Sequence, residues 1–297
     1  MTRLGDGSDR VGIVKTDVVL ATCAAWPEGE PGHEHLDVAL AGRGIAARWA
    51  RWDDPGVGWD GSLVAVRSTW DYETRLEEFL GWARSVPRLL NGADVFAWNT
   101  DKAYLVALAA LGLDVVPTLV VDGEESLPAA IAEFGATVVK PRVGAGGRGV
   151  VVFDGTDGGP AALDESMLGP GPWVVQPLVE SVRSEGELSV FVLGGEVVSA
   201  TQKRPASGEI RVHEQYGGST VAVPVPDESA ALARRTVAAA EDLLGHRLDY
   251  ARVDQMRLAD GRLALSELEV TEPGLYLDVL PANGDAFAAL VATRLAR

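Results

Sequence analysis

A glycine-rich stretch at residues 144–149 constrains this chain more than any other feature of its sequence. It carries four glycines in six positions, and apolar runs at 138–139 and 150–152 flank it. Glycine avoids Cβ clashes and accepts positive φ, so successive N–H groups can converge on one anion. Lys140 and Arg148 add positive charge beside and within the stretch. These features predict a loop between two strands that covers an anionic ligand. A plain hairpin turn with surplus glycine is the alternative.

Two common nucleotide-binding templates do not fit this stretch. A P-loop needs Lys-Ser or Lys-Thr after its last glycine, whereas Val150 follows Gly149 here. The dinucleotide fingerprint leads into a helix, whereas a β-branched run follows the glycines here. The remaining interpretation is a flexible hairpin that covers phosphates from above.

The net charge of −17 over 297 residues limits the kinds of partner that this chain can bind. Most of such a surface would repel a nucleic acid, so the anion site must be local. Lysine is rare, and its four positions are Lys15, Lys102, Lys140 and Lys203. No apolar run reaches membrane-spanning length, and the N-terminus lacks the layout of a secretory signal. We therefore expect a cytoplasmic protein that binds neither nucleic acid nor a membrane.

The first hundred residues alternate between strand and helix patterns. Apolar runs at 11–23, 45–52 and 62–66 predict strands, and the spacing at 34–44 and 73–84 predicts helices. This order is typical of an α/β layer with a parallel sheet. Loops at the carboxyl ends of parallel strands bind ligands, so we expect a substrate pocket at 67–75. The alternative is a helix N-terminus with a polar cap and its aromatic rings in the core. The pocket candidates are Arg67, Ser68, Trp70, Asp71, Tyr72 and Arg75.

The middle of the chain predicts further helices and strands. Helical spacing begins at 99–102, where Asn99 or Thr100 can cap the helix. Lys102 at the positive end of a helix is unfavourable by roughly a few tenths of a kcal/mol, so it is either solvated or bound to an anion. Strands are predicted at 115–121, 173–176, 188–193, 196–202 and 210–213, and helices at 124–134, 160–168 and 227–244.

The last hairpin, residues 250–270, carries three carboxylates close together. A turn at 259–262 pairs its strands so that Asp254 lies across from Glu267 and Glu269. The two glutamates are two residues apart, so both emerge on the same face of their strand. Carboxylates among apolar residues repel one another unless a cation lies between them, and hard oxygen ligands suit Mg²⁺. The sequence predicts a magnesium site, with a solvated acidic face on an edge hairpin as the alternative.

From about residue 99 to residue 277, the chain resembles the ATP-grasp superfamily in the order and approximate spacing of its motifs. These motifs are Lys102, Val139-Lys140-Pro141, Val175-Gln176-Pro177-Leu178-Val179-Glu180, Glu187, Lys203-Arg204, Arg211, Asp254 and Glu267-Leu268-Glu269. The segments 67–72, 98–102 and 267–273 are similar to the branch of bacterial glutathione synthetase and the ribosomal protein S6 modifying ligases. Within that branch they most resemble the cyclo-ligases that form cycloserine from O-ureido-serine. Glu269 stands where many relatives carry Asn.

The resemblance implies an α/β protein with an ATP-grasp fold, whose nucleotide-binding part is α+β. Residues 1–98 would form an N-terminal parallel α/β domain. Residues 99–177 would form a central ATP-grasp subdomain with the glycine-rich lid. Residues 178–297 would form a C-terminal subdomain with the metal site.

The resemblance also implies an ADP-forming ligase that makes C–N bonds. The γ-phosphoryl group of ATP would activate the carboxylate of a small amino acid as an acylphosphate, which an amine would attack. The product would be a dipeptide, another amide or an intramolecular ring, in specialised metabolism such as antibiotic biosynthesis. The alternatives are a ligase that tailors a peptide or carrier, and an ATP-binding regulatory protein without turnover. The sequence leaves open the identity of the substrate and the choice between ligation and cyclisation. It also leaves open the oligomeric state, for which a homodimer is one option.

The resemblance assigns a role to each matching residue. The phosphates would bind Lys102, Lys140 and the backbone of Gly144, Gly146, Gly147 and Gly149. Adenine would bind Gln176, Pro177, Leu178 and Val179, with an N–H from Leu178 or Val179 because proline has none. The ribose would bind Glu187 and Glu180, and Mg²⁺, or Mn²⁺ in its place, would bind Asp254, Glu267 and Glu269. Lys203, Arg204 and Arg211 would face the substrate carboxylate or the transferring phosphate, and Glu272 and Tyr276 would join the substrate pocket.

Overall fold

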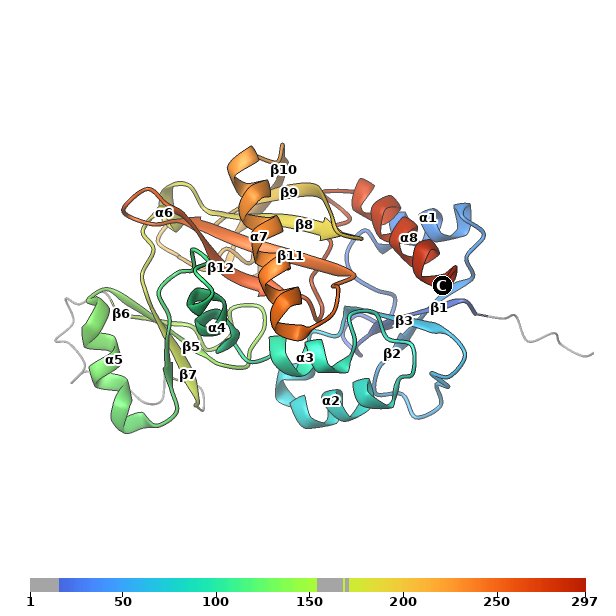
Figure 1. Cartoon of the computed structure of the whole chain (residues 1–297), viewed down its shortest axis with the longest axis horizontal. Coiled ribbons are helices and arrows are strands. Elements are labelled where there is room, and N and C mark those ends of the chain that lie inside the picture. The colour runs from blue at the N-terminus through green and yellow to red at the C-terminus, as the bar shows by residue number, and fades with distance from the viewer. Residues whose placement is uncertain (1–15, 154–167, 169–170) are drawn as a thin grey trace, which may run out of the picture.

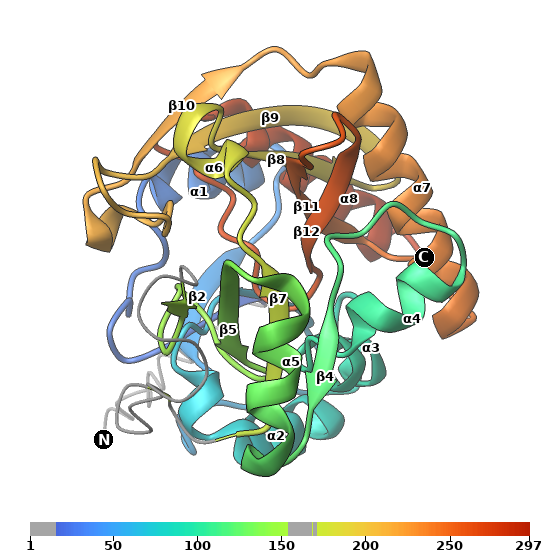
Figure 2. The same cartoon turned by 90° about the vertical axis from the view of Figure 1, so that its left-hand side faces the viewer.

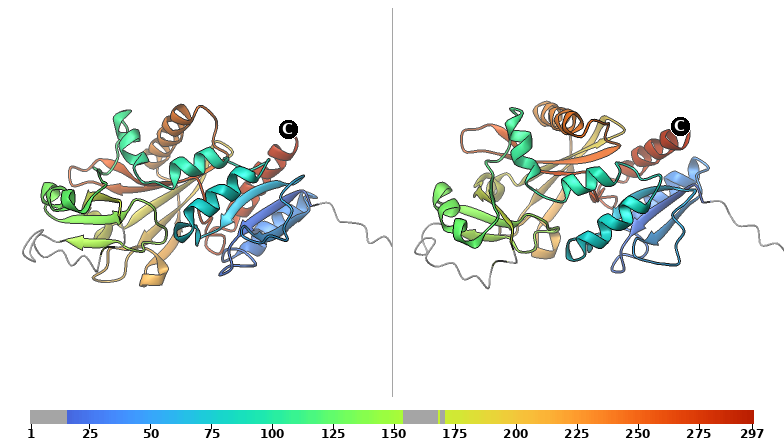
Figure 3. Two further views of the ribbon diagram at one scale, coloured as in Figure 1. Left: turned by 90° about the horizontal axis from the view of Figure 1, so that it is seen from below. Right: turned by 60° about the horizontal axis from the view of Figure 1, so that its bottom comes forward.

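Three β-sheets organise the computed structural model, which describes residues 16–153, 168 and 171–297. In Figure 1 the N-terminal sheet lies at the right, a central sheet lies at the lower left, and the largest sheet lies above them. Figure 2 shows the same sheets from the side, and Figure 3 shows them from below. One sheet is parallel and two are antiparallel, which is the α/β architecture predicted. The helix expected at 160–168 lies outside the described residues, apart from Leu168.

The N-terminal sheet is parallel, as predicted. Its strand order is β2 (Ala47–Arg51), β1 (Val18–Thr22) and β3 (Leu63–Ser68). Successive side chains of β1 and β3 enter two different cores because they point to opposite faces of the sheet. One face packs on α1 (His33–Gly42) and the C-terminal helix α8 (Ala282–Leu295), and the other on α2 (Leu76–Ser85) and α3 (Ala93–Asn99). The end of the chain therefore completes the first layer.

Two helix predictions in this region are wrong in detail. The helix expected at 73–84 is a single 3₁₀ turn, Tyr72–Thr74, followed by α2. The helix expected to begin at 99 is two helices, because α3 ends at Asn99 and α4 (Tyr104–Ala110) starts after a turn. Asn99 does not cap a helix. Its side chain donates to Leu268 O at 2.7 Å and accepts from Val270 N at 3.0 Å, which fixes the turn against the last hairpin.

The central sheet is antiparallel and carries the glycine-rich stretch. Its strand order is β4 (Leu119–Val121), β7 (Trp173–Pro177), β5 (Thr137–Pro141) and β6 (Val151–Phe153), and α5 (Leu127–Phe134) packs on it. β5 pairs directly with β6, so the predicted hairpin around the glycines is confirmed. The strand expected at 115–121 is shorter than predicted, because Val115 forms a bridge to Leu265 of the largest sheet instead.

The largest sheet has five antiparallel strands. Their order is β10 (Ser219–Val223), β9 (Glu196–Arg204), β8 (Glu187–Leu193), β11 (Tyr250–Arg257) and β12 (Leu263–Glu269). The long helix α7 (Asp227–Leu244) packs on this sheet, and a short helix α6 (Ser181–Ser184) precedes β8. The strand predicted at 210–213 is wrong. That segment leads into a 3₁₀ turn, Glu214–Tyr216, and β10 forms the edge of the sheet.

None of the helices in the described part of the chain has the length and apolar content that crossing a membrane requires. The boundaries expected after residues 98 and 177 stay predictions. The α8 helix shows that the C-terminal segment belongs to two layers, because it packs on the N-terminal sheet and also touches β8 and β9.

Candidate active site

A cavity of about 510 Å³ lies where the three sheets meet. The strands that line it carry most of the residues expected to bind the nucleotide and the metal, and the loop after β3 lines its other end. The expected nucleotide and reaction residues on its wall are Lys102, Lys140, Gly144, Gly146, Gly147, Gln176, Pro177, Leu178, Val179, Glu187, Lys203, Arg211, Asp254, Glu267 and Glu269. The expected substrate residues on its wall are Trp70, Asp71, Tyr72, Glu272 and Tyr276.

Three expected substrate residues do not line the cavity. Arg67 is fully buried behind the wall, where it pairs with Glu30 at 3.0 Å and stacks over the Phe287 ring. The Ser68 hydroxyl bonds to Thr22 at 2.7 Å. Arg75 faces away and pairs with Asp53 and Asp71 at 3.0 Å each. The expectation that these residues touch a substrate is wrong for this arrangement, because partners inside the N-terminal layer satisfy them.

Three expected nucleotide or reaction residues also lie off the cavity wall. Arg204 is exposed and donates to Ser184 O at 3.0 Å. Glu180 is exposed and pairs with Arg183 at 3.2 Å. Gly149 turns the chain at φ 69° against Pro141, where an added Cβ would lie 2.8 Å from Pro141 Cγ. The close approach to Pro141 therefore explains why position 149 is glycine, without any contact with a ligand.

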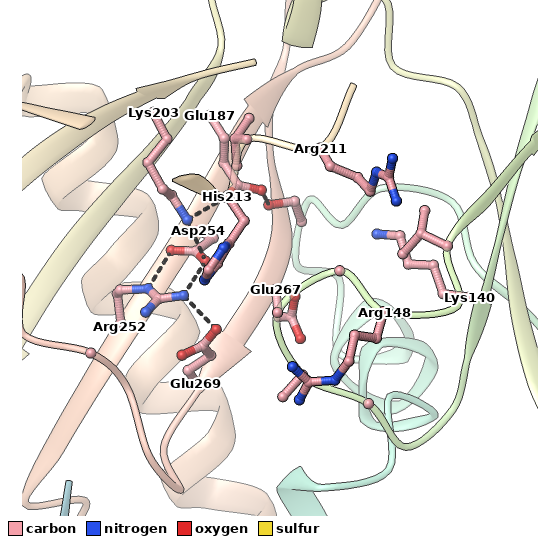
Figure 4. A pocket seen from close by; sticks show the side chains of 18 of the residues that line it. Lys140, Arg148, Glu187, Lys203, Arg211, His213, Arg252, Asp254, Glu267 and Glu269 are labelled. Carbon is pink, nitrogen blue, oxygen red and sulfur yellow. Dashed lines mark hydrogen bonds and ion pairs between the residues drawn. The ribbon is translucent and has the colours of Figure 1, made fainter. Parts of the chain in front are cut away.

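Asp254 is held by more cations than the sequence indicated. Arg252 binds both of its carboxylate oxygens at 2.9 Å, Lys203 Nζ lies 3.2 Å from Oδ2, and the Ser189 hydroxyl donates to Oδ1 at 2.6 Å. Arg252 also contacts Glu269, so the two carboxylates lie on either side of one guanidinium (Figure 4). Burial alone would raise the pKa of Asp254, but Arg252 and Lys203 hold it well below its usual range. Asp254 is therefore a firmly ionised anchor.

Glu187 and Lys203 form the next link of this network. Lys203 Nζ lies 2.6 Å from Glu187 Oε1, and the Ser266 hydroxyl donates to Glu187 Oε2 at 3.0 Å. The strand register explains the pair, because Glu187 of β8 is directly opposite Lys203 of β9. Burial would lower the pKa of Lys203, but the negative charges of Asp254 and Glu187 keep it above its ordinary value. The predicted ribose ligand is thus an ion-pair partner in this arrangement.

Two lysines approach the cavity from the other side. Lys102 Nζ lies 3.1 Å from Glu267 Oε1 and donates to Gly144 O at 2.7 Å, so it joins the last hairpin to the glycine loop. Lys140 forms no ion pair with any described residue and points into the cavity beside Arg211 (Figure 4). Burial lowers the pKa of Lys140, against the attraction of Glu267. A half-buried cation without an ion-pair partner favours an anionic ligand at this point.

The three predicted metal ligands do not form one group. Asp254 lies opposite Glu267 across the two strands, as the hairpin predicted, but Arg252 intervenes between Asp254 and Glu269. Among the described residues, no three His, Cys, Asp or Glu side chains are close enough together to hold a metal ion. The three carboxylates therefore do not form a cluster in this arrangement, and their role as metal ligands stays a prediction. Glu267 and Glu269 still fit Mg²⁺, which commonly takes one or two carboxylates with the phosphates of a nucleotide.

The remaining carboxyl groups of the cavity are easily protonated. Burial raises the pKa of Glu269 to about 7. The charges of Asp254 and Glu267 add to this effect, and the charge of Arg252 opposes it. Burial and the nearby Glu269 raise the pKa of Glu272 to about 8. A cationic ligand would favour the ionised form of both groups.

A family model decides what kind of protein carries this cavity. The model described as the prokaryotic glutathione synthetase ATP-grasp domain matches residues 105–274, which is more than half of the chain. The chain belongs to the ATP-grasp family. A second model, the N-terminal domain of D-cycloserine synthetase DcsG, matches residues 18–91 of this ATP-grasp protein.

Similar proteins agree with this assignment. The cycloserine biosynthesis protein DcsG of Streptomyces lavendulae is 32% identical over 268 residues, or 85% of this chain and 90% of that protein. The crystal structure of D-cycloserine synthetase DcsG matches with a TM-score of 0.82 at 29% identity, over 94% of this chain and 99% of that one. The ATP-grasp ligase PsnB, complexed with minimal precursor, Mg and ADP, has a TM-score of 0.63 at 18% identity, over 95% and 99% of the two chains. The last likeness supports the fold alone. The predicted fold and C–N ligase class are confirmed.

One hydrogen bond at the end of the cavity predicted to hold adenine bears on the choice between Leu178 and Val179. The N–H of Leu178 donates to Ala136 O at 2.9 Å, so it is already used within the protein. Val179 is then the better of the two candidates for an N–H that contacts adenine. The Gln176 side chain donates to Thr118 Oγ1 at 2.9 Å, which fixes it in the wall.

Sequence reasoning missed two charged residues of the ATP-grasp cavity. Arg252 lies two positions before Asp254 on β11, and the period of a strand could have placed both side chains on one face. Glu30 lies in a loop after β1, far in sequence from its partner Arg67, and accepts from Leu275 N at 2.6 Å. Nothing local to Glu30 indicates this role, because its two partners, Arg67 and Leu275, come from distant segments.

Proposed function

We propose that this ATP-grasp ligase binds ATP with Mg²⁺ in the cavity and joins the carboxylate of a small amino acid to a nitrogen. One observation carries the proposal. Three of the four lysines, Lys102, Lys140 and Lys203, reach a single cavity that Glu267 and Glu269 also line. Fixed cations and metal-binding carboxylates in one cavity match the needs of phosphoryl transfer.

The reaction has two steps. First, a carboxylate oxygen takes the γ-phosphoryl group and ADP leaves. Second, a nitrogen lone pair forms the C–N bond, the C–O bond to phosphate breaks, inorganic phosphate leaves, and the nitrogen loses a proton. The acylphosphate hydrolyses in water, so the site must exclude water between the two steps.

The residues of the chain divide this work. Lys140 is free to bind the phosphates, and Lys102 joins the glycine loop to Glu267, so it supports a closed loop over them. Glu267 and Glu269 would hold Mg²⁺, which neutralises charge on the transferring phosphoryl group when bound. Asp254 is our third candidate ligand, although Arg252 and Lys203 occupy its oxygens in this arrangement. Lys203 and Arg211 also line the cavity, and they would stabilise negative charge that develops on the reacting groups.

The proposed substrate is a small amino acid, and the proposed setting is antibiotic biosynthesis. The similarity to the cycloserine biosynthesis protein DcsG extends over 85% of this chain, which supports ring closure as one form of the reaction. The structures of peptide-modifying ligases are below 25% identity, so they give no support to peptide tailoring. The retained lysines and glutamates count against a protein without turnover.

Phosphate release from ATP, measured with Mg²⁺ over a panel of D- and L-amino acids, tests the proposal. We expect one or more amino acids to stimulate release in the wild type, and Lys140→Ala to abolish the stimulation. Arg204→Ala is the matched control, because this cation lies off the cavity wall. Amino-acid-dependent release that survives Lys140→Ala would contradict the assignment.

A further inference from the structure

Glu272 differs from every other buried or half-buried acidic side chain on the cavity wall in having no cation beside it. The others are paired with Lys or Arg, and they are Glu30, Asp71, Glu187, Asp254, Glu267 and Glu269. Glu272 is only 7% exposed, and among the described residues no Lys or Arg nitrogen lies within 4.0 Å of its carboxyl group. The cavity is therefore electrostatically incomplete at this one point.

The side chains that form hydrogen bonds with Glu272 are neutral and aromatic, whereas Glu269, Glu267 and Lys102 act on it through their charges. The Tyr72 hydroxyl donates a hydrogen bond to its carboxyl group, and Tyr72 itself is 4% exposed. The Trp70 indole donates to the backbone oxygen of Glu272 at 3.1 Å, and the rings of Trp70 and Tyr276 both belong to the cavity wall. A hydroxyl group cannot neutralise a buried carboxylate, whereas aromatic rings favour a cation placed over them.

A ligand that brings its own positive charge would complete this corner. A buried ionised carboxylate is stable only with a counter-charge and satisfied hydrogen bonds. The chain supplies that counter-charge for Asp254, through Arg252 and Lys203, but not for Glu272. Because Glu272 is 7% exposed and lines the cavity, a small ammonium group held in the cavity could supply the missing charge.

Glu272 also lies on the substrate side of the metal-binding pair. It follows Glu269 by three residues, beyond the end of β12, and its neighbours Trp70 and Tyr72 belong to the loop after β3. A molecule held there can reach toward Glu267 and Glu269, where the phosphoryl group would be transferred. The position thus suits a group that anchors the substrate and does not react.

We propose that Glu272 binds the ammonium group of the amino-acid substrate and that this amine passes unchanged into the product. The inference rests on the proposed function. An ammonium group has no lone pair, so it cannot attack the acylphosphate while it is bound to the carboxylate. A different nitrogen of the same or a second molecule forms the C–N bond and loses its proton, and phosphate leaves with the C–O electrons. The substrate class is a small amino acid with a free α-amine and a second, uncharged nitrogen nucleophile.

Calorimetric binding of D-cycloserine in the presence of ADP and Mg²⁺ tests this inference, with its N-acetyl derivative as the uncharged probe. D-cycloserine keeps a free amine, so we expect it to bind the wild type and its N-acetyl derivative not to bind. Glu272→Gln loses a charged hydrogen bond, so the affinity of this variant for D-cycloserine should fall by about tenfold or more. Glu272→Asp keeps the charge and should retain part of the wild-type affinity. Asp278→Asn is the matched control, because Asp278 lines the same cavity but is exposed.

ADP affinity separates a folding defect from a binding defect, because Glu272→Gln should bind ADP as the wild type does. Tyr72→Phe is a second variant that keeps the carboxylate, and it should still reject the N-acetyl probe. Equal binding of D-cycloserine by Glu272→Gln and wild type would overturn the inference. So would equal binding of the two probes, or failure of an ADP-binding wild type to bind D-cycloserine.

The proposed function fails separately. It is lost if no amino acid stimulates phosphate release by the wild type. The inference alone is lost if an amino acid stimulates release equally in Glu272→Gln and wild type at every concentration.

Discussion

Arg148 of the glycine loop and Glu73 of the loop after β3, 75 positions apart in the chain, form an ion pair with 2.6 Å between Arg148 Nε and Glu73 Oε1. Arg148 also donates to Trp70 O at 3.1 Å, and the Gln215 side chain donates to Gly146 O at 2.7 Å. The loop proposed to cover the phosphates is therefore attached to the loop that lines the substrate end.

Glu73→Gln should loosen the glycine loop. A partly exposed ion pair contributes about 0.2–1 kcal/mol, so amide hydrogen exchange at residues 144–149 should accelerate by up to about fivefold. Mass spectrometry of the corresponding peptides measures it. Glu180→Gln is the control, because it removes an exposed ion pair with Arg183 away from the cavity. Unchanged exchange in Glu73→Gln would show that the ion pair does not hold the loop.

Arg252→Met should destabilise the protein strongly. The variant leaves Asp254 and Glu269 buried without their shared cation, and breaking a buried pair costs about 3–5 kcal/mol. Urea unfolding measures the loss. Arg257→Met on the same strand is the control, because Arg257 pairs with Glu228 and Glu185 at the surface and should contribute about 1 kcal/mol or less. Equal losses in the two variants would contradict the view that Arg252 neutralises the site.

Without ligands, the protein should lose stability as the pH rises from about 4.5 to about 8. The pKa of Glu272 is about 8 in the folded state, against an ordinary value of 4.5. In this window the folded state binds more protons than the unfolded state, so the free energy of unfolding falls with rising pH. Glu272→Gln removes this contribution, which is at most about 1.4 kcal/mol per pH unit. Urea unfolding at several pH values should show a flatter dependence in the variant, and parallel curves would refute the prediction.

Gly186→Ala should damage the site through the backbone. Gly186 has φ 83°, and an added Cβ would lie 2.1 Å from Lys203 O, so β8 and β9 must move apart where Glu187 meets Lys203. Gly208→Ala is matched in conformation, with φ 85°, but has no atom within 4 Å of the added Cβ. Both variants carry the strain of a positive φ, and Gly186→Ala should lose about 1–3 kcal/mol more. Thermal unfolding of the two variants measures the difference, and equal losses would contradict the prediction.

Several features were predictable because their causes are local. The hairpin around residues 144–149 follows from two β-branched runs and the glycines between them. The pairing of Asp254 with Glu267 follows from the strand period and a tight turn. The break between α3 and α4 was not predictable, because Asn99 bonds to the backbone of Leu268 and Val270, at the end of β12 and about 170 residues later.

By itself, the sequence determined the parallel N-terminal layer, the glycine hairpin and the last hairpin, and it predicted an anion site served by lysines. Only the tertiary structure decided which charges neutralise one another. Packing β11 between β8 and β12 brings Ser189 and Lys203 to Asp254, and Arg252 then occupies the space where a three-carboxylate metal group was expected. Ion pairing depends on distances set by the assembled sheets, whereas strand and turn patterns depend on neighbouring residues. That is why Glu272 could be recognised as the buried carboxylate without a cation only after all of its neighbours were in place.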